Sequence, residues 1–107
     1  MTRSLLLGVA VMVAASSAAF AKEVEVKISD FEFKPSSITV KQGESVKFTN
    51  LDSAPHNVAP DKGAKFKASE KMAKNQSQTV MFNEIGDQHY LCEIHPAMKG
   101  LVKVVAK

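Results

Sequence analysis

The stretch YLCEIHPAMKG at residues 90–100 holds the only cysteine of the chain, with a histidine and a methionine following at three-residue intervals. Cys92, His95 and Met98 offer a thiolate, an imidazole and a thioether. No second cysteine is present to form a disulfide or a four-thiolate zinc site. Soft sulfur ligands combined with imidazole favour copper. We therefore interpret this stretch as part of a copper site.

Short strands surround this stretch. Apolar and polar residues alternate, as in half-buried strands, and no long segment has the period of a helix. The alternating segments are residues 23–28, continued by Phe31 and Phe33, then 38–40, 45–50, 79–82, 88–92 and 101–105. Gly43 and Gly86 stand in the turns between them. This pattern predicts an all-β fold, an antiparallel β-sandwich.

The N-terminus has the layout of a secretory signal, because Arg3 precedes an apolar run at residues 5–15 and small residues surround a cleavage point after Ala21. We expect residues 1–21 to be removed and residues 22–107 to form one small domain in the periplasm. The eleven-residue apolar run is shorter than the roughly 20 residues of a membrane-spanning helix. The processed chain is thus expected to be free of the membrane.

The charge of the processed chain is nearly balanced. Without Arg3 it has 13 lysines and 11 acidic residues, a net charge of +2. A surplus this small does not indicate a nucleic-acid partner. The unpaired Cys92 is more informative, because exported proteins usually pair their cysteines, and a bound metal explains a lone thiol.

A second segment, SAPHNV at residues 53–58, supplies a candidate fourth ligand, His56. The loops of a sandwich gather at its ends, so His56 can meet Cys92 although 36 positions separate them. Two imidazoles and one thiolate, with a weak axial thioether, form the ligand set of a blue copper electron-transfer site. Zinc also binds cysteine and histidine, but Met98 favours copper over zinc.

These residues together resemble the cupredoxins. The pattern that carries the resemblance is Pro55-His56-Asn57, followed by Tyr90-x-Cys92-x-x-His95-Pro96-x-Met98-x-Gly100. With two residues between His95 and Met98, the ligand loop is similar to the short loop of the amicyanin-like branch. The resemblance implies a Greek-key β-sandwich of the cupredoxin type, with the copper site between loops at one end.

The resemblance also implies roles for individual residues. His56, Cys92 and His95 become the strong ligands of one copper ion that cycles between Cu+ and Cu2+, and Met98 becomes the axial ligand. Asn57 is similar to the asparagine that joins the two ligand loops and donates a backbone hydrogen bond to the cysteine sulfur.

Partners follow from the same resemblance. Pro96, Ala97 and Pro55 are expected to form an apolar patch around His95 where redox proteins dock. By analogy the donor is a periplasmic dehydrogenase, as methylamine dehydrogenase is for the amicyanins, and the acceptor is a c-type cytochrome. A monomer is expected at this size.

The chain departs from the amicyanin-like pattern in two places. Ile94 stands before His95 where these proteins typically have proline, which removes one fixed φ from the loop and puts the reduction potential in doubt. The processed chain also begins later than in typical amicyanins, so an N-terminal strand is expected to be missing.

The segment at residues 59–76 does not fit a strand and is rich in lysine. Lysines stand at positions 62, 65, 67, 71 and 74. A solvated loop is the simpler interpretation, and docking of an acidic partner is the alternative. We expect a short helical turn at residues 68–74, with Phe66 and Met72 pinning the segment to the core.

Two further residue types have simpler explanations than metal binding. His89 is expected to face solvent, because neighbouring residues on a strand point to opposite faces and Tyr90 points inward. Met72 and Met81 are explained by packing.

Two functional alternatives remain beside electron transfer. A periplasmic copper carrier or buffer could use the same four ligands. A cysteine–histidine enzyme would use Cys92 as a nucleophile, with His95 or His56 as its base.

Overall fold

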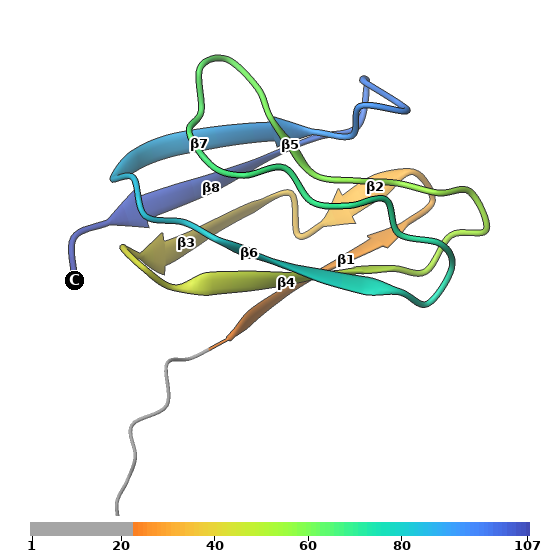
Figure 1. Cartoon of the computed structure of the whole chain (residues 1–107), viewed down its shortest axis with the longest axis horizontal. Coiled ribbons are helices and arrows are strands. Elements are labelled where there is room, and N and C mark those ends of the chain that lie inside the picture. Colours follow the sequence, from red (N-terminus) through yellow and green to blue (C-terminus); the bar gives the residue numbers. More distant parts are fainter. Residues whose placement is uncertain (1–22) are drawn as a thin grey trace, which may run out of the picture.

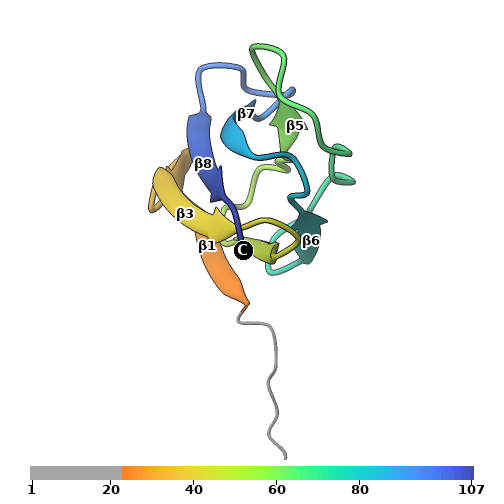
Figure 2. The same ribbon diagram turned by 90° about the vertical axis from the view of Figure 1, so that its left-hand side faces the viewer.

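A computed structural model of the chain describes residues 23–107, so the predicted signal segment at residues 1–21 lies outside the described part. Eight strands form two four-stranded sheets (Figures 1 and 2). The first sheet has the order β2 (Glu32–Lys34), β1 (Val24–Ser29), β4 (Ser45–Asn50) and β6 (Ser77–Met81). The second has the order β3 (Ser37–Lys41), β8 (Lys99–Val105), β7 (Gly86–Leu91) and β5 (Ala59–Pro60). Within residues 23–107 no helix is long and apolar enough to cross a membrane.

The predicted β-sandwich is confirmed, but the prediction that its strands are all antiparallel was wrong. β1 pairs in parallel with β4, and β3 pairs in parallel with β8, while the remaining pairs are antiparallel. Apolar alternation shows which face of a strand is buried, and this pattern is the same for either direction of the neighbouring strand. The sequence pattern therefore contains no information on strand direction.

The core lies between the two sheets, and aromatic rings fill its centre. Tyr90 of β7 meets Phe33 at 4.8 Å and Phe48 at 5.4 Å between ring centroids, both in edge-to-face geometry. Gly100 of β8 lies against the Tyr90 ring, and a Cβ at this position would overlap the Tyr90 side chain. This close approach fixes where the loop between β7 and β8 rejoins the sheet.

The Tyr90 hydroxyl is buried and has no hydrogen-bond partner among the described residues. Desolvation by the surrounding core raises the pKa of Tyr90 well above its ordinary value. The hydroxyl therefore stays neutral in the folded protein.

The lysine-rich segment between β5 and β6 is irregular, with turns at residues 62–63 and 74–75, and the helical turn predicted at residues 68–74 is absent. Met72 instead forms an isolated bridge with His56, because each backbone N–H donates to the other residue's carbonyl, at 3.2 Å and 2.8 Å. Met72 is fully buried and Phe66 packs against Phe82, which confirms that Met72 and Phe66 pin the segment. Strand pairing with residue 56 overrides the local helical preference.

Two smaller predictions have mixed outcomes. His89 lies between the buried residues Gln88 and Tyr90, so it faces away from the core as predicted, although it is half-buried. Met81 is 55% exposed, so core packing does not account for it.

Candidate metal centre

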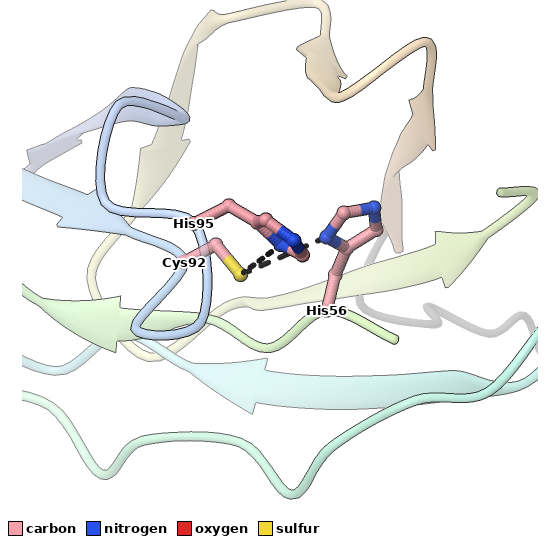
Figure 3. Close-up of side chains that lie close together, drawn as sticks. All are labelled: His56, Cys92 and His95. Carbon is pink, nitrogen blue, oxygen red and sulfur yellow. Dashed lines mark hydrogen bonds between the residues drawn. The ribbon is translucent and has the colours of Figure 1, made fainter. Parts of the chain in front are cut away.

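Three potential metal ligands meet at one end of the sandwich. The ligand atoms of His56, Cys92 and His95 all lie within 4.8 Å of one another (Figure 3). The Cys92 Sγ is 3.7 Å from Nδ1 of His56 and 4.0 Å from Nδ1 of His95. His56 and Cys92 are fully buried, and His95 is half-buried.

The loop after β7 brings Cys92, His95 and Met98 together. The Met98 N–H donates to the His95 carbonyl at 2.9 Å, and the Cys92 N–H donates to the Met98 carbonyl at 3.1 Å. These two bonds close the loop into a compact turn. Met98 is only 5% exposed, so its thioether is buried with the loop.

The loop after β4 is shaped by Asn50, which is fully buried. Its Nδ2 donates to the carbonyls of Ala54 at 2.9 Å and Met72 at 2.8 Å, and its Oδ1 accepts from the Asp52 N–H at 2.9 Å. Every bond made by this amide is to backbone, so a single side chain determines the path of the chain into His56.

Asn57 joins the two ligand loops. Its side chain donates to Glu93 Oε1 at 2.9 Å and accepts from the Glu93 N–H at 2.8 Å. Its backbone N–H points to the Cys92 sulfur at 3.5 Å. An N–H aimed at the sulfur stabilises negative charge on a thiolate.

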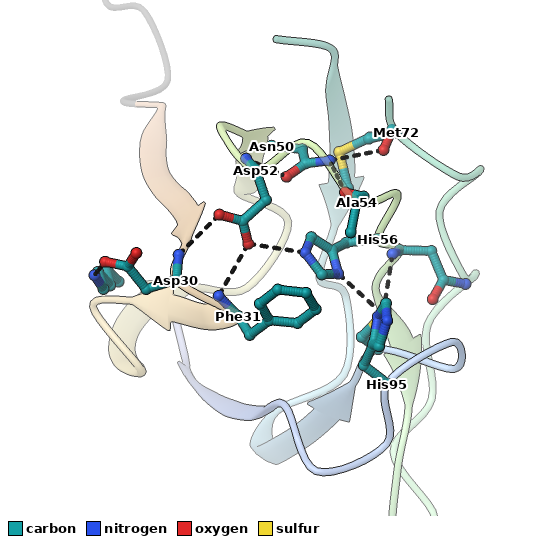
Figure 4. A network of polar contacts seen from close by, with 11 residues as sticks. Asp30, Phe31, Asn50, Asp52, Ala54, His56, Met72 and His95 are labelled. Carbon is teal, nitrogen blue, oxygen red and sulfur yellow. Dashed lines mark hydrogen bonds and ion pairs between the residues drawn. The ribbon is translucent and has the colours of Figure 1, made fainter. Parts of the chain in front are cut away.

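The structure adds two residues to the site that the sequence analysis missed, Asp52 and Phe31 (Figure 4). Asp52 Oδ2 lies 2.9 Å from Nε2 of His56, on the side of the ring away from Cys92. The Phe31 ring stands edge-to-face against His56 at 5.1 Å and against His95 at 4.9 Å between centroids. A carboxylate four residues before His56 was visible in the sequence, but the turn that holds Phe31 beside it was not.

The environment of Asp52 keeps it ionised. Desolvation by itself would raise the pKa of Asp52, but hydrogen bonds from the Phe31 N–H, the His56 ring and the Asp30 N–H outweigh it, so the pKa is lowered from its ordinary value. An ionised Asp52 accepts the proton on Nε2 of His56, which leaves the Nδ1 lone pair directed at Cys92.

The donor atoms fit a thiophilic metal ion. The Cys92 sulfur faces one ring nitrogen of each histidine, so one soft sulfur donor and two nitrogen donors converge in one place. Metal bonds of about 2.3 Å to sulfur and 2.0 Å to nitrogen would place those atoms roughly 3.7 Å apart in a trigonal plane. The observed separations of 3.7 Å and 4.0 Å agree with this arrangement.

Comparison with known proteins now identifies the family. Residues 20–105 match the model of the copper-binding proteins of the plastocyanin/azurin family. The chain belongs to this family. It is an amicyanin-like cupredoxin of the blue copper, electron-transfer type, and its cofactor is one copper ion.

Individual relatives agree with this assignment. Amicyanin-alpha of Methylorubrum extorquens is 37% identical over 87 residues, covering 78% of this chain and 73% of that protein. Amicyanin of Paracoccus versutus is 38% identical over 87 residues, covering 78% of this chain and 66% of that protein. The crystal structure of Paracoccus versutus amicyanin superposes with a TM-score of 0.71 over 80% of this chain and 84% of that chain. The predicted resemblance of the chain to the amicyanin-like cupredoxins is thereby confirmed.

Exposed apolar residues flank His95 in its loop, and the Phe31 ring packs against its imidazole. Pro55, Pro96 and Ala97 are exposed, as are the side chains of Phe31 and Ile94. Ile94, which directly precedes His95, is 39% exposed. The half-buried imidazole of His95 therefore lies beside an apolar surface formed by Phe31 and by its exposed loop neighbours Ile94, Pro96 and Ala97.

Proposed function

We propose that this cupredoxin is a periplasmic protein that transfers single electrons between larger redox proteins, with His56, Cys92, His95 and Met98 as its copper ligands. The observation that carries the proposal is the convergence of the Cys92 sulfur and two Nδ1 atoms in a buried site. Bound copper supplies one-electron cycling between Cu+ and Cu2+.

The protein's own contribution is to hold the donors in one arrangement. Asn50 sets the loop that carries His56, Asn57 joins that loop to Glu93, and the turn from Cys92 to Met98 closes on itself. Ligands that are already in place need little movement when the charge of the site changes. The Asn57 N–H offsets charge on the Cys92 sulfur, which tunes the potential.

Electrons are proposed to enter and leave through the edge of His95. The other imidazole is fully buried, whereas His95 is half-buried beneath the apolar surface that includes Pro96. An apolar surface suits transient docking of another protein. We propose a periplasmic dehydrogenase as the donor and a c-type cytochrome as the acceptor, with the carrier itself a monomer.

The decisive experiment is to load the protein with copper and record its spectra. We expect an intense blue colour from charge transfer between thiolate and metal, and reversible voltammetry with copper retained in both states. A colourless copper(II) complex with an ordinary electron paramagnetic resonance spectrum would refute the proposal. Loss of copper on reduction would instead support a carrier or buffer. Alkylation of Cys92 at equal rates with and without copper would support the cysteine–histidine enzyme.

The proposed location has a separate test. Mass spectrometry of the protein from the periplasmic fraction should find a chain that starts at Lys22, which follows the predicted cleavage point after Ala21. A chain that retains residues 1–21, or one found in the cytoplasmic fraction alone, would contradict export.

A further inference from the structure

The turn between β1 and β2 has a conformation that its residues do not favour. Asp30 and Phe31 are its two central residues, and their φ angles are +54° and +58°. Two-residue hairpin loops with positive φ at both positions usually contain asparagine or aspartate followed by glycine. A bulky residue such as phenylalanine is strained in this region. Contacts from outside the turn must therefore hold Phe31 in place.

Asp52 provides these contacts from the loop that carries His56. The Asp30 N–H donates to Oδ1 of Asp52 at 2.8 Å, and the Phe31 N–H donates to Oδ2 at 2.9 Å. Successive N–H groups that converge on one anion form a favourable binding geometry for a carboxylate. The Asp52 side chain is only 14% exposed, although the turn that it bonds lies at the surface.

The same carboxylate also holds His56. Oδ2 of Asp52 lies 2.9 Å from Nε2 of His56 (Figure 4), and the other ring nitrogen of His56 faces Cys92 (Figure 3). The turn held by Asp52 places the Phe31 ring edge-to-face with both imidazoles, at 5.1 Å and 4.9 Å. One carboxylate thus joins a strained turn, an aromatic ring and a histidine of the metal centre.

We propose that Asp52 is a positioning residue of the copper site. It fixes the ring orientation of His56 from the side away from Cys92, and it holds the Phe31 ring in edge-to-face contact with His56 and His95. The part of this inference that concerns copper rests on the proposed function of His56. The part that concerns the turn stands on the hydrogen bonds to Asp30 and Phe31 alone.

Two effects on the copper site follow. A carboxylate bonded to the outer nitrogen makes an imidazole a better donor, which stabilises copper(II) more than copper(I). Loss of Asp52 should therefore raise the reduction potential. Removing an outer partner of a metal-bound histidine typically weakens metal binding by roughly 10- to 100-fold.

Asp61 is a matched control for Asp52. Its carboxylate is similarly shielded, at 19% exposure, and it forms an ion pair with Lys99 Nζ at 3.2 Å. Within residues 23–107 that carboxylate makes no hydrogen bond to His56, Phe31 or His95. Asp52→Ala and Asp61→Ala change the net charge equally, so a difference between them reports the specific contacts of Asp52.

The first measurement uses the metal-free protein and follows backbone amide exchange by nuclear magnetic resonance. In Asp52→Ala we expect the amides of Asp30 and Phe31 to exchange about tenfold faster, because bonds to a charged acceptor are lost. Asp61→Ala should leave both rates unchanged. Equal rates in the two variants would overturn the proposed hold on the turn.

The second measurement uses the copper-loaded protein. We expect Asp52→Ala to have a higher potential and weaker copper binding in a competition titration than Asp61→Ala. Equal potentials and affinities would overturn the positioning of His56. Asp52→Asn, which preserves shape and one acceptor oxygen, replaces Asp52→Ala if that variant fails to fold, and the same comparison then applies with Asp61→Asn.

The two proposals fail in different ways. If the unmodified protein forms no blue copper complex, the proposed function fails and the copper part of this inference fails with it, while the exchange rates still decide the role of Asp52 in the turn. If the unmodified protein is blue but the Asp52 and Asp61 variants are alike, this inference alone is wrong.

Discussion

The two histidines of the metal centre are held in different ways. His56 is fully buried, its outer nitrogen is bonded to Asp52, and its backbone is bridged to Met72. His95 is half-buried, and within the described residues its ring makes a polar contact only with the Cys92 sulfur. One histidine is thus fixed from both sides, whereas the other is open on the side that faces the apolar surface.

This difference separates two requirements of an electron carrier. Fixed donors keep the geometry of the metal constant, which His56 and its partners provide. Contact with another protein needs a ligand near the surface, which His95 provides. The loop that carries His56 is built from buried polar bonds around Asn50. The loop that carries His95 is closed by two backbone hydrogen bonds and joins β8 where Gly100 packs against Tyr90.

Replacing Cys92, whose sulfur faces the histidines of both loops, should have the largest effect. Cys92→Ser removes the thiolate that faces both Nδ1 atoms. We expect complete loss of the intense visible band and much weaker copper binding, because an alcohol is a poor donor to copper. Absorption spectra of the copper-loaded variant measure this directly. An equally blue serine variant would show that Cys92 is not a ligand.

Removing one imidazole at a time tests the difference between the loops. His56→Gly and His95→Gly each leave a vacancy, but only the vacancy at residue 95 lies next to the surface. Imidazole added from solution should therefore restore the blue colour in His95→Gly at a concentration that leaves His56→Gly unrestored. Titration with imidazole, followed by absorption, gives the comparison. Equal restoration in both variants would mean that burial does not distinguish the two sites.

The sequence predicted the loop that carries Cys92, His95 and Met98 better than the loop that carries His56. Cys92, His95 and Met98 are close in the chain, so their spacing alone placed them together, and ligand chemistry indicated copper. His56 was found because the loops of a sandwich gather at its ends. Asp52 and Phe31 were missed because their contacts depend on a turn with positive φ at Asp30 and Phe31, which residue preferences do not predict.

Strand positions were also easier to predict than strand directions. The alternation at residues 45–50 marks β4 correctly, yet the same pattern fits a parallel or an antiparallel neighbour. The expected helical turn at residues 68–74 was wrong because Met72 pairs with His56 across the fold. Both errors concern contacts between segments far apart in the chain, which local sequence does not encode.

Substituting a residue that positions each ligand loop should destabilise the protein, for a different reason in each loop. Asn50→Ala leaves the Ala54 carbonyl and the Asp52 N–H without partners and removes one of the two donors to the Met72 carbonyl, at a cost of roughly 3 kcal/mol. Gly100→Ala forces a methyl group into the Tyr90 ring, at a cost of about 2 kcal/mol. Denaturant unfolding of the metal-free variants measures both costs.

Nuclear magnetic resonance spectra show which ligand loop each of these two substitutions disturbs. Chemical shifts around His56 should move most in Asn50→Ala, and those around His95 should move most in Gly100→Ala. Asn83 is exposed, so Asn83→Ala serves as a control and should leave stability within about 0.5 kcal/mol. The same pattern of shifts in both destabilised variants would show that the loops are not held independently.

Removing the Tyr90 hydroxyl should have the smallest effect, and it should be stabilising. The hydroxyl is buried without a partner, so Tyr90→Phe is expected to gain about 1 kcal/mol. Desolvation raises the pKa of Tyr90 in the folded state, so its contribution to stability is complete below the unfolded pKa of about 10 and declines as the pH rises above it. Tyr90→Phe should lack this decline. Because Tyr90 is the only tyrosine, tyrosinate absorbance follows its ionisation alone, and ionisation near pH 10 without unfolding would show that the ring is accessible to water.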